Sequence, residues 1–238
     1  MRGKETKKFT FQMNDKEKAE VKCEHMVLFD KVKQKCANEH IDLLIFDEII
    51  GACNTVVNDN GVLTGTITDG IGAMQALKDE GVEYVGKKMV VIGAGGAATA
   101  IQVQAALDGV RELTIFNLDD EFFARGEETV KKLRERTDCI VNIYHLEDHA
   151  KLKEELDSAD ILIDSSSCGM KPLEDVVALP DKSYLRPDLV VMDTVYAPRQ
   201  TKLMRWCDEV GCKNFNGLGM MLYQAPLPSN FGQAKKCR

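Results

Sequence analysis

Several features that would place this chain in a specialised class are absent from its sequence. None of its apolar runs approaches the length of a membrane-spanning helix, and the basic start Met1–Lys8 is not followed by the apolar core of a secretory signal. No internal repeat and no low-complexity linker occurs. The formal net charge is −7, with both signs scattered along the chain, which argues against a nucleic-acid or anionic-membrane partner. These absences favour a cytoplasmic enzyme or binding protein whose partner is a small molecule.

The cysteine and histidine patterns also lack the signature of disulfides or of a metal site. The chain has eight cysteines and no Cys-x-x-Cys pair, and a chain of 238 residues does not need covalent cross-links, so we expect reduced thiols. His145 and His149 are spaced i, i+4. However, Leu146 follows the first of them, where a zinc-binding His-Glu-x-x-His helix has Glu. We expect both histidines in a surface turn and no metal.

A nucleotide-binding pattern is present at Met89–Ala100, which reads Met-Val-Val-Ile-Gly-Ala-Gly-Gly-Ala-Ala-Thr-Ala. Its four leading apolar residues predict a strand that is buried on both faces. The glycines at 93, 95 and 96 predict a tight turn, and the small residues after them predict a helix over 97–107. Such a turn lets the backbone approach a pyrophosphate, and the helix start offers free N–H groups and the positive end of its dipole. The sequence therefore predicts a dinucleotide site.

An acidic pair supports this prediction and bears on which dinucleotide is bound. Leu113–Asn117 predicts the next strand, and Asp119 and Asp120 follow it, where an acid hydrogen-bonds the adenosine ribose in such sites. No Arg stands between Phe116 and Phe123 to hold a 2′-phosphate, which favours NAD and leaves NADP as the second choice. The alternative is an acidic turn that opens a helix at Glu121, where carboxylates suit the helix dipole.

Alternating strand and helix patterns predict the fold class. The expected strands cover 89–92, 113–117, 140–144, 161–164, 189–195 and 213–215, and the expected helices cover 71–79, 97–107, 121–136, 150–156 and 201–209. This order predicts an α/β protein with a Rossmann-type, doubly wound parallel sheet. Ligands then lie outside the carboxyl ends of the strands, which carry small or polar residues at 93–96, 117–120, 165–168 and 194–197. Before this region, a hairpin over 56–63 turns at 58–61, where Asn-Gly stands.

Five motifs, in order and spacing, resemble those of the shikimate and quinate/shikimate dehydrogenases. They are Asn54–Val57, Gly65–Gly70, Gly93–Ala98, Gly169–Pro172 and Asn216–Gln224. The resemblance covers residues 49–224, and the stretch 116–123 is similar to the quinate/shikimate branch in particular.

The resemblance implies an oxidoreductase that transfers a hydride between nicotinamide and a ring hydroxyl or ketone of shikimate or quinate, at a site between two domains. The implied division is a substrate domain of 1–80 plus 219–238, smaller than usual, and a nucleotide domain of 81–218. Asn54, Asp69 and Gln224 would bind the substrate, and Lys33 and Asp69 would be catalytic, with the lysine exchanging the hydroxyl proton. A homodimer is compatible with the sequence. The expected cofactor contacts are Gly93, Ala94, Gly95, Gly96, Ala97, Asn117, Asp120, Ser167, Thr194, Val195, Tyr196 and Gly217.

The sequence departs from the family pattern mainly in its first part. The family's Ser-x-Ser grip for the substrate carboxylate is missing, and the first 50 residues contain no serine. Lys33 lacks the Thr-x-Pro that usually precedes the catalytic lysine. An alternative interpretation is therefore a catalytically impaired nucleotide-binding homologue that acts as a sensor or partner subunit. Other departures are Ile67 and Ala197 in place of Asn, Ser165–Cys168 in place of an Asn-Ala-Thr-like stretch, and Pro226 and Pro228 where a helix normally continues.

Overall fold

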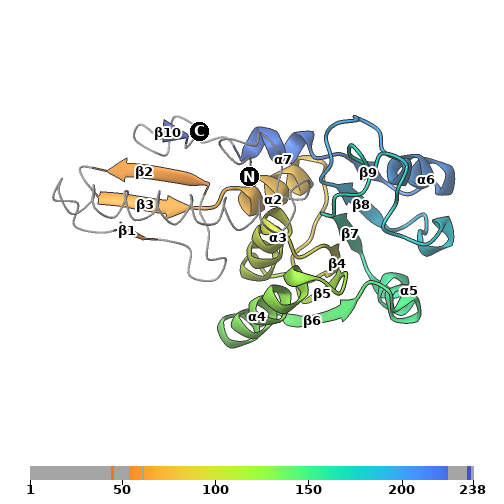
Figure 1. Cartoon of the computed structure of the whole chain (residues 1–238), viewed down its shortest axis with the longest axis horizontal. Helices are drawn as coiled ribbons and strands as arrows, with labels where there is room; N and C mark the ends of the chain where they lie inside the picture. Colours follow the sequence, from red (N-terminus) through yellow and green to blue (C-terminus); the bar gives the residue numbers. More distant parts are fainter. Residues whose placement is uncertain (1–43, 46–53, 60–61, 225–234, 237–238) are drawn as a thin grey trace.

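The computed structural model of the chain describes residues 44–45, 54–59, 62–224 and 235–236. These residues form two sheets, one of six strands and one of four, with helices packed around the larger sheet (Figure 1). The prediction of an α/β protein with a doubly wound parallel sheet is confirmed.

The larger sheet is parallel, and its strand order is β6-β5-β4-β7-β8-β9. The chain begins this sheet in the middle with β4, builds outward to β6, and then returns to the other side of β4 with β7. The point between β4 and β7 is thus the place where the winding reverses and where ligands of such sheets bind. The strands are β4 Lys88–Ile92, β5 Glu112–Asn117, β6 Ile140–His145, β7 Ile161–Asp164, β8 Val190–Asp193 and β9 Asn214–Phe215.

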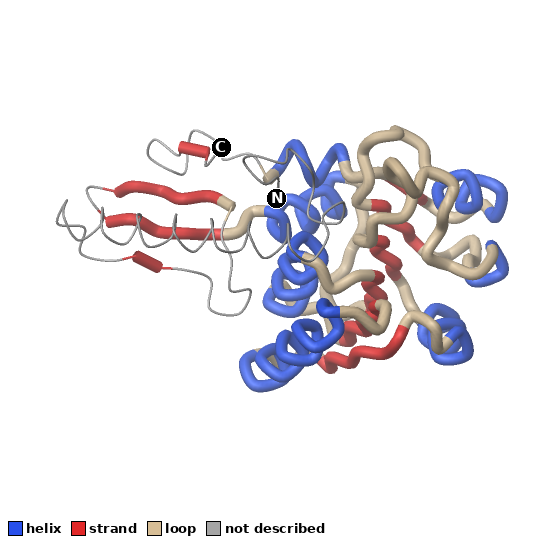
Figure 2. The backbone as a smooth tube through the Cα atoms, in the orientation of Figure 1, coloured by secondary structure: helices blue, strands red, loops and turns tan. Residues whose placement is uncertain are grey.

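Helices lie on both faces of this sheet, as Figure 2 shows. One face carries α3 and α4, with α2 packed on α3, and the other carries α5 and α6. A short helix, α7, packs on α2. The bounds are α2 Asp69–Asp79, α3 Gly96–Leu107, α4 Glu121–Arg136, α5 His149–Ser158, α6 Lys202–Val210, α7 Leu218–Tyr223 and the 3-10 helix η2 Lys182–Tyr184.

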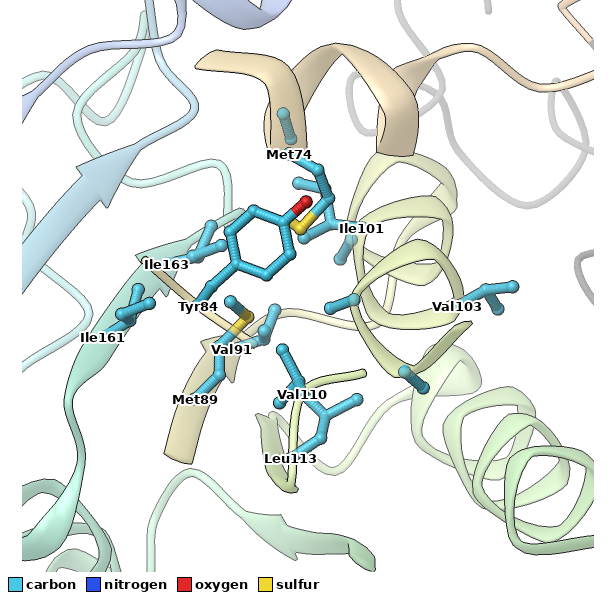
Figure 3. Close-up of a cluster of buried hydrophobic side chains, with 14 of the residues drawn as sticks. Met74, Tyr84, Met89, Val91, Ile101, Val103, Val110, Leu113, Ile161 and Ile163 are labelled. Carbon is cyan, nitrogen blue, oxygen red and sulfur yellow. The ribbon is translucent and has the colours of Figure 1, made fainter. Parts of the chain in front are cut away.

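The core is divided by the sheet because alternate residues of each strand point to opposite faces. Met89 and Val91 of β4 face the cluster under α2 and α3, whereas Val90 and Ile92 face the cluster under α5 and α6. Figure 3 shows the first cluster, in which the ring of Tyr84 lies among aliphatic side chains. The Tyr84 hydroxyl donates to Asp108 at 2.9 Å, so this buried aromatic ring keeps a partner for its polar end.

The smaller sheet is built on a hairpin of β2 (Thr55–Asp59) and β3 (Val62–Thr66). The predicted hairpin is therefore confirmed. Asn58 and Asp59, which were predicted in the turn, instead pair with Leu63 and Val62 in the strands, and the Asn-Gly pair at 60–61 lies outside the described residues. Two short strands complete this sheet, β1 (Leu44–Ile45) parallel to β3 and β10 (Lys235–Lys236) antiparallel to β2.

Some predicted boundaries were wrong for identifiable local reasons. Helix α2 begins at Asp69, two residues before the predicted start, with Thr68 at its N-cap position. The strand predicted over 189–195 ends at Asp193, because the Asp193 carboxylate accepts from the Val195 N–H at 2.9 Å and turns the chain. The two histidines lie at the end of β6 and the start of α5, and the turn lies between them.

Candidate functional site

The glycine turn after β4 has the geometry that a phosphate-binding loop requires. Gly93 has a φ of 109°, and a Cβ there would come within 2.7 Å of the Ser165 carbonyl oxygen, so only glycine fits. Its N–H donates to the Phe116 carbonyl at 2.7 Å, which ties the turn to the end of β5. Gly95 and Gly96 face open space: no other atom lies within 4 Å of where their Cβ atoms would stand.

Helix α3 starts directly at this open stretch. Gly95 is its N-cap residue, Gly96 is its first residue, and no side chain caps its first N–H groups. These donors and the positive end of a twelve-residue helix point to the place where a diphosphate would lie. Of the residues that the sequence assigns to the cofactor, Gly93 and Ala94 are buried beneath the turn, and Gly95, Gly96 and Ala97 are at least partly exposed at the start of α3. The residues present fit a dinucleotide.

The acid predicted at the ribose lies beside this turn, and it also serves the helix that follows. Asp120 is exposed and is the N-cap of α4, where its Oδ1 accepts from the Phe122 N–H at 2.9 Å. The same oxygen accepts from the Asn117 side-chain amide at 2.8 Å. Helix opening, which was the alternative to a ribose contact, is therefore one role of this acid, and the two roles are compatible.

Two further loops reach the same edge of the sheet, after β7 and β8. Asp164 and Asp193 end these strands side by side, are 3% and 2% exposed, and each accepts from the backbone N–H two residues onward. Burial, and then the nearby Asp164 carboxyl, raises the pKa of Asp193 to about 7. Burial also raises the pKa of Asp164 and that of the Cys168 thiol. The Asp164 carboxyl thus fixes the backbone at the start of the loop that contains Ser167. The Asp193 carboxyl does the same for the loop that contains Thr194, Val195 and Tyr196.

Gly217 joins the last of these loops to α7. Its N–H donates to the Val195 carbonyl at 3.1 Å, and a Cβ at this position would overlap the Thr194 carbonyl oxygen. Glycine is therefore required at position 217, because the backbone at Thr194 comes too close for any side chain. It is the N-cap residue of α7, at whose other end Gln224 is the C-cap. One short helix consequently connects the nucleotide edge to a residue that the sequence assigns to the substrate.

The three predicted substrate residues meet around Thr68, far from one another in sequence. Asn54 donates to the Asp69 carboxylate at 2.9 Å, and its own carbonyl oxygen accepts from the Thr68 N–H at 3.0 Å. The Thr68 hydroxyl oxygen lies 3.2 Å from the same Asn54 oxygen and donates its one hydrogen to the Gln224 backbone carbonyl at 2.8 Å, across 156 residues of chain. The structure thus brings Asn54, Asp69 and Gln224 to one place. Lys33, the predicted catalytic lysine, lies outside the described residues.

Sequence reasoning missed four residues that shape this site. Thr68 is the centre of the cluster, and the only sequence feature that could have indicated it is its place beside Asp69 in the Gly65–Gly70 motif. Asp164 and Asp193 were visible as acids in otherwise apolar strands. Gln102 is 0% exposed and donates to the Gly93 carbonyl at 2.8 Å, and its only signal was a polar residue inside the apolar stretch of α3.

Across the described parts of the chain, no helix is long and apolar enough to cross a membrane. The same residues contain no cluster of three or more His, Cys, Asp or Glu that could hold a metal ion.

The sheet order and the glycine turn define the class: a Rossmann-type dinucleotide-binding protein. No model of a protein family matches the chain. The chain is 52% identical over 177 residues to the curated shikimate dehydrogenase (NADP(+)) of Listeria monocytogenes serotype 4b, a match that covers 74% of this chain and 61% of that protein. The chain belongs to the shikimate dehydrogenase family, and it spans about three fifths of the length of that relative.

Solved structures agree with this assignment. One is shikimate 5-dehydrogenase from Listeria monocytogenes in complex with shikimate and NAD, at 51% identity and a TM-score of 0.74, over 76% of this chain and 63% of that one. Another is quinate dehydrogenase from Corynebacterium glutamicum in complex with NAD, at 25% identity and a TM-score of 0.65, over 76% of this chain and 63% of that one. The resemblance inferred from five motifs is confirmed at the level of the family.

Proposed function

We propose that this protein is a nicotinamide-dependent oxidoreductase that acts on a ring hydroxyl of shikimate or quinate. One observation carries the proposal: the Asn54–Asp69–Gln224 cluster is joined through α7 and Gly217 to the glycine-turn edge of the sheet. The residues proposed for the polyol and those proposed for the dinucleotide are thus joined through one short helix. The 52% identity to the shikimate dehydrogenase of Listeria monocytogenes supports the same chemistry.

In this proposal the chain's own residues divide the work. The backbone at 93–97 holds the diphosphate, and the loops at Ser167 and 194–196 hold the nicotinamide end. Asn54 and Gln224 orient the substrate ring, and Asp69 orients its hydroxyl. When bound, the nicotinamide exchanges the hydride with the ring carbon. Lys33 takes up and returns the hydroxyl proton, a role that rests on the family resemblance.

We further propose that NAD is preferred over NADP. Asp120 stands at the end of β5 beside the glycine turn, and no arginine occurs in 116–123 to pair with a 2′-phosphate. A carboxylate at that place hydrogen-bonds free ribose hydroxyls and repels a phosphate. The protein would act in the cytoplasm, with 1–80 plus 219–238 as the substrate domain and 81–218 as the nucleotide domain.

The proposal is tested by following nicotinamide reduction with shikimate and with quinate, each with NAD and with NADP. We expect turnover with NAD to exceed turnover with NADP. Lys33→Ala, which removes the proposed proton-transfer group, and Asp69→Asn, which removes the carboxylate that orients the hydroxyl, are each expected to lower kcat by on the order of 100-fold or more. Both variants should keep the wild-type Kd for NAD.

Asp157→Asn is the control, because Asp157 lies on α5, on the opposite face of the sheet from α2, and its side chain is 55% exposed and pairs with Lys153. It should leave kcat unchanged. Clear NAD binding with no turnover on either polyol would instead favour the impaired, nucleotide-binding homologue.

A further inference from the structure

The peptide group between Gly93 and Ala94 is held from both sides by side-chain amides. On one side, the Gln102 Nε2 of α3 donates to the Gly93 carbonyl at 2.8 Å. On the other side, the Ala94 N–H donates to the Asn117 Oδ1 at the end of β5, at 2.9 Å. Gln102 is 0% exposed and Asn117 is 7% exposed, so water does not compete freely for either bond. The orientation of this peptide group is therefore fixed by long-range contacts as well as by the glycine.

Asn117 passes this constraint on to the acid proposed at the ribose. Its Nδ2 donates to the Leu118 carbonyl at 2.8 Å and to the Asp120 carboxylate at 2.8 Å. Both hydrogens and the oxygen of the amide are thus engaged within the protein. Asn117 acts on a ligand by placing other groups, namely the Ala94 N–H and the Asp120 carboxylate.

Gln102 is an unfavourable choice for the free energy of folding if its role is only to stabilise the fold. Its Oε1 is the one side-chain nitrogen or oxygen that is buried without a hydrogen-bond partner in the portion of the chain that the structure describes. An unpaired buried acceptor is unfavourable. An apolar residue of similar size would avoid this defect but would leave the Gly93 carbonyl without its donor. Such local violations are expected where a residue serves a site.

We propose that Gln102 and Asn117 are positioning residues for the dinucleotide. Together they lock the 93–94 peptide group, so that the turn presents its following N–H groups to the diphosphate in one fixed orientation. Through Asp120 the same network sets the distance between the diphosphate and ribose sites. This inference rests on the proposed function, because it takes the turn to bind a nicotinamide dinucleotide.

The test uses the full chain and the change Gln102→Met, which keeps the side-chain length and removes both polar atoms. We expect the Kd for NAD, measured by calorimetry, to rise about tenfold, because one buried hydrogen bond orients the loop. The KM for shikimate should stay within about twofold of wild type. The melting temperature should change little, because the unpaired Oε1 is lost together with the bond to Gly93. A purely structural role would instead lower the melting temperature and leave the Kd for NAD unchanged.

Gln104→Met is the matched control, since Gln104 lies on the same helix and donates to Asp108 at 2.7 Å, away from the turn. It should leave the Kd for NAD at the wild-type value. Asn117→Asp is a second variant, which keeps the acceptor for Ala94 and replaces the two donated bonds by a second carboxylate beside Asp120. We expect it also to weaken NAD binding.

The outcomes separate this inference from the proposed function. If the wild-type protein binds neither NAD nor NADP, both are overturned. If it binds NAD, and Gln102→Met and Asn117→Asp bind NAD as tightly as wild type, the positioning role alone is overturned.

Discussion

Asp164 and Asp193 are adjacent carboxyl groups at the ends of β7 and β8, and none of the described cationic side chains is among the groups that set their pKa values. Two charges so close in a buried place are unfavourable, so the pair titrates as a unit and keeps a proton to higher pH than exposed acids do. Each carboxyl also accepts hydrogen bonds, Asp193 from the Val195 N–H at 2.9 Å and the Thr201 hydroxyl at 2.6 Å, and Asp164 from the Ser166 N–H at 2.9 Å. This pair makes the stability of the fold sensitive to pH near neutrality.

The change Asp193→Asn tests this sensitivity. Burial raises the pKa of Asp193 from 3.8 to about 7, so the folded state binds more protons than the unfolded state between these values. The stability that comes from the protonated form is complete below the unfolded pKa and is lost as pH rises through the folded pKa. We therefore expect wild type to lose about 2 kcal/mol of unfolding free energy between about pH 5.5 and pH 8 through Asp193, and Asp193→Asn to lose less, because one of the two buried carboxyl groups with a raised pKa is removed.

Urea unfolding at the two pH values measures this difference. Asp188→Asn, an exposed acid in the loop before β8, serves as the control and should follow wild type. Equal losses in wild type and in Asp193→Asn would contradict the prediction.

At the scale of elements, the sheet is joined to α5 by a buried cluster of charges at its end away from the candidate site. Lys88, at the start of β4, contacts Glu112 at 2.8 Å and Glu155 of α5 at 2.7 Å. Lys151 and the Thr114 hydroxyl also reach Glu155, at 2.8 and 3.0 Å. Burial opposes the charge of Glu155, but the hydrogen bonds from Lys151, Lys88 and Thr114 outweigh it and lower its pKa. The cluster is favourable only while each charge keeps its partners.

Glu155→Gln removes the shared anion and leaves Lys88 buried with one partner. We expect this change to lower the free energy of unfolding by about 3 kcal/mol, because the buried Lys88 ammonium loses one of its two anionic partners. The double change Lys88→Met with Glu155→Leu should recover much of the loss, since apolar side chains do not need partners there. Urea denaturation measures both.

Glu154→Gln provides the comparison on the same helix, because Glu154 pairs with Lys151 at 2.9 Å but its side chain is 69% exposed. Its loss should cost less than about 1 kcal/mol. A Glu155→Gln cost as small as that of Glu154→Gln would show that the cluster contributes nothing beyond a surface pair.

At the scale of the whole molecule, the strands, turns and helices of the nucleotide-binding half were predictable from the sequence. The hydrogen bonds that join distant residues at the candidate site were not. Strand β4, the glycine turn and helix α4 depend on local patterns: a continuous apolar run, three glycines, and an acid before an amphipathic helix. The end predicted for β8, residue 195, was wrong because the Asp193 side chain accepts from the Val195 N–H and turns the backbone. Thr68 was missed because its partner Gln224 is far along the chain, where no periodicity points to it. Gln102 was missed because a side-chain bond to the backbone of the Gly93 turn leaves no pattern in the sequence.

The contact between α2 and α7 is the place where these long-range links converge. Asp69 begins α2, Gln224 caps α7, and Gly217 begins α7 at the nucleotide edge. Gly72 allows the two helices to approach, because a Cβ there would lie 2.6 Å from the Met220 carbonyl oxygen and 2.8 Å from the Gln224 nitrogen. The relative position of the proposed substrate and nucleotide sites therefore depends on the close approach that Gly72 allows.

Gly72→Ala should separate the two sites without damaging either. The added methyl group meets backbone, which yields less readily than a side chain, so α7 must shift against α2. We expect kcat with shikimate to fall by on the order of tenfold or more, because small misplacements of reacting groups are costly. The Kd for NAD should stay within about twofold, since the glycine turn is carried by β4 and α3. Gln75→Ala, a substitution three residues further along the same helix, should keep wild-type turnover, and circular dichroism would check that both variants are folded. If Gly72→Ala weakened NAD binding as much as it lowered kcat, the two sites would not be separable in this way, and α7 would belong to the nucleotide site itself.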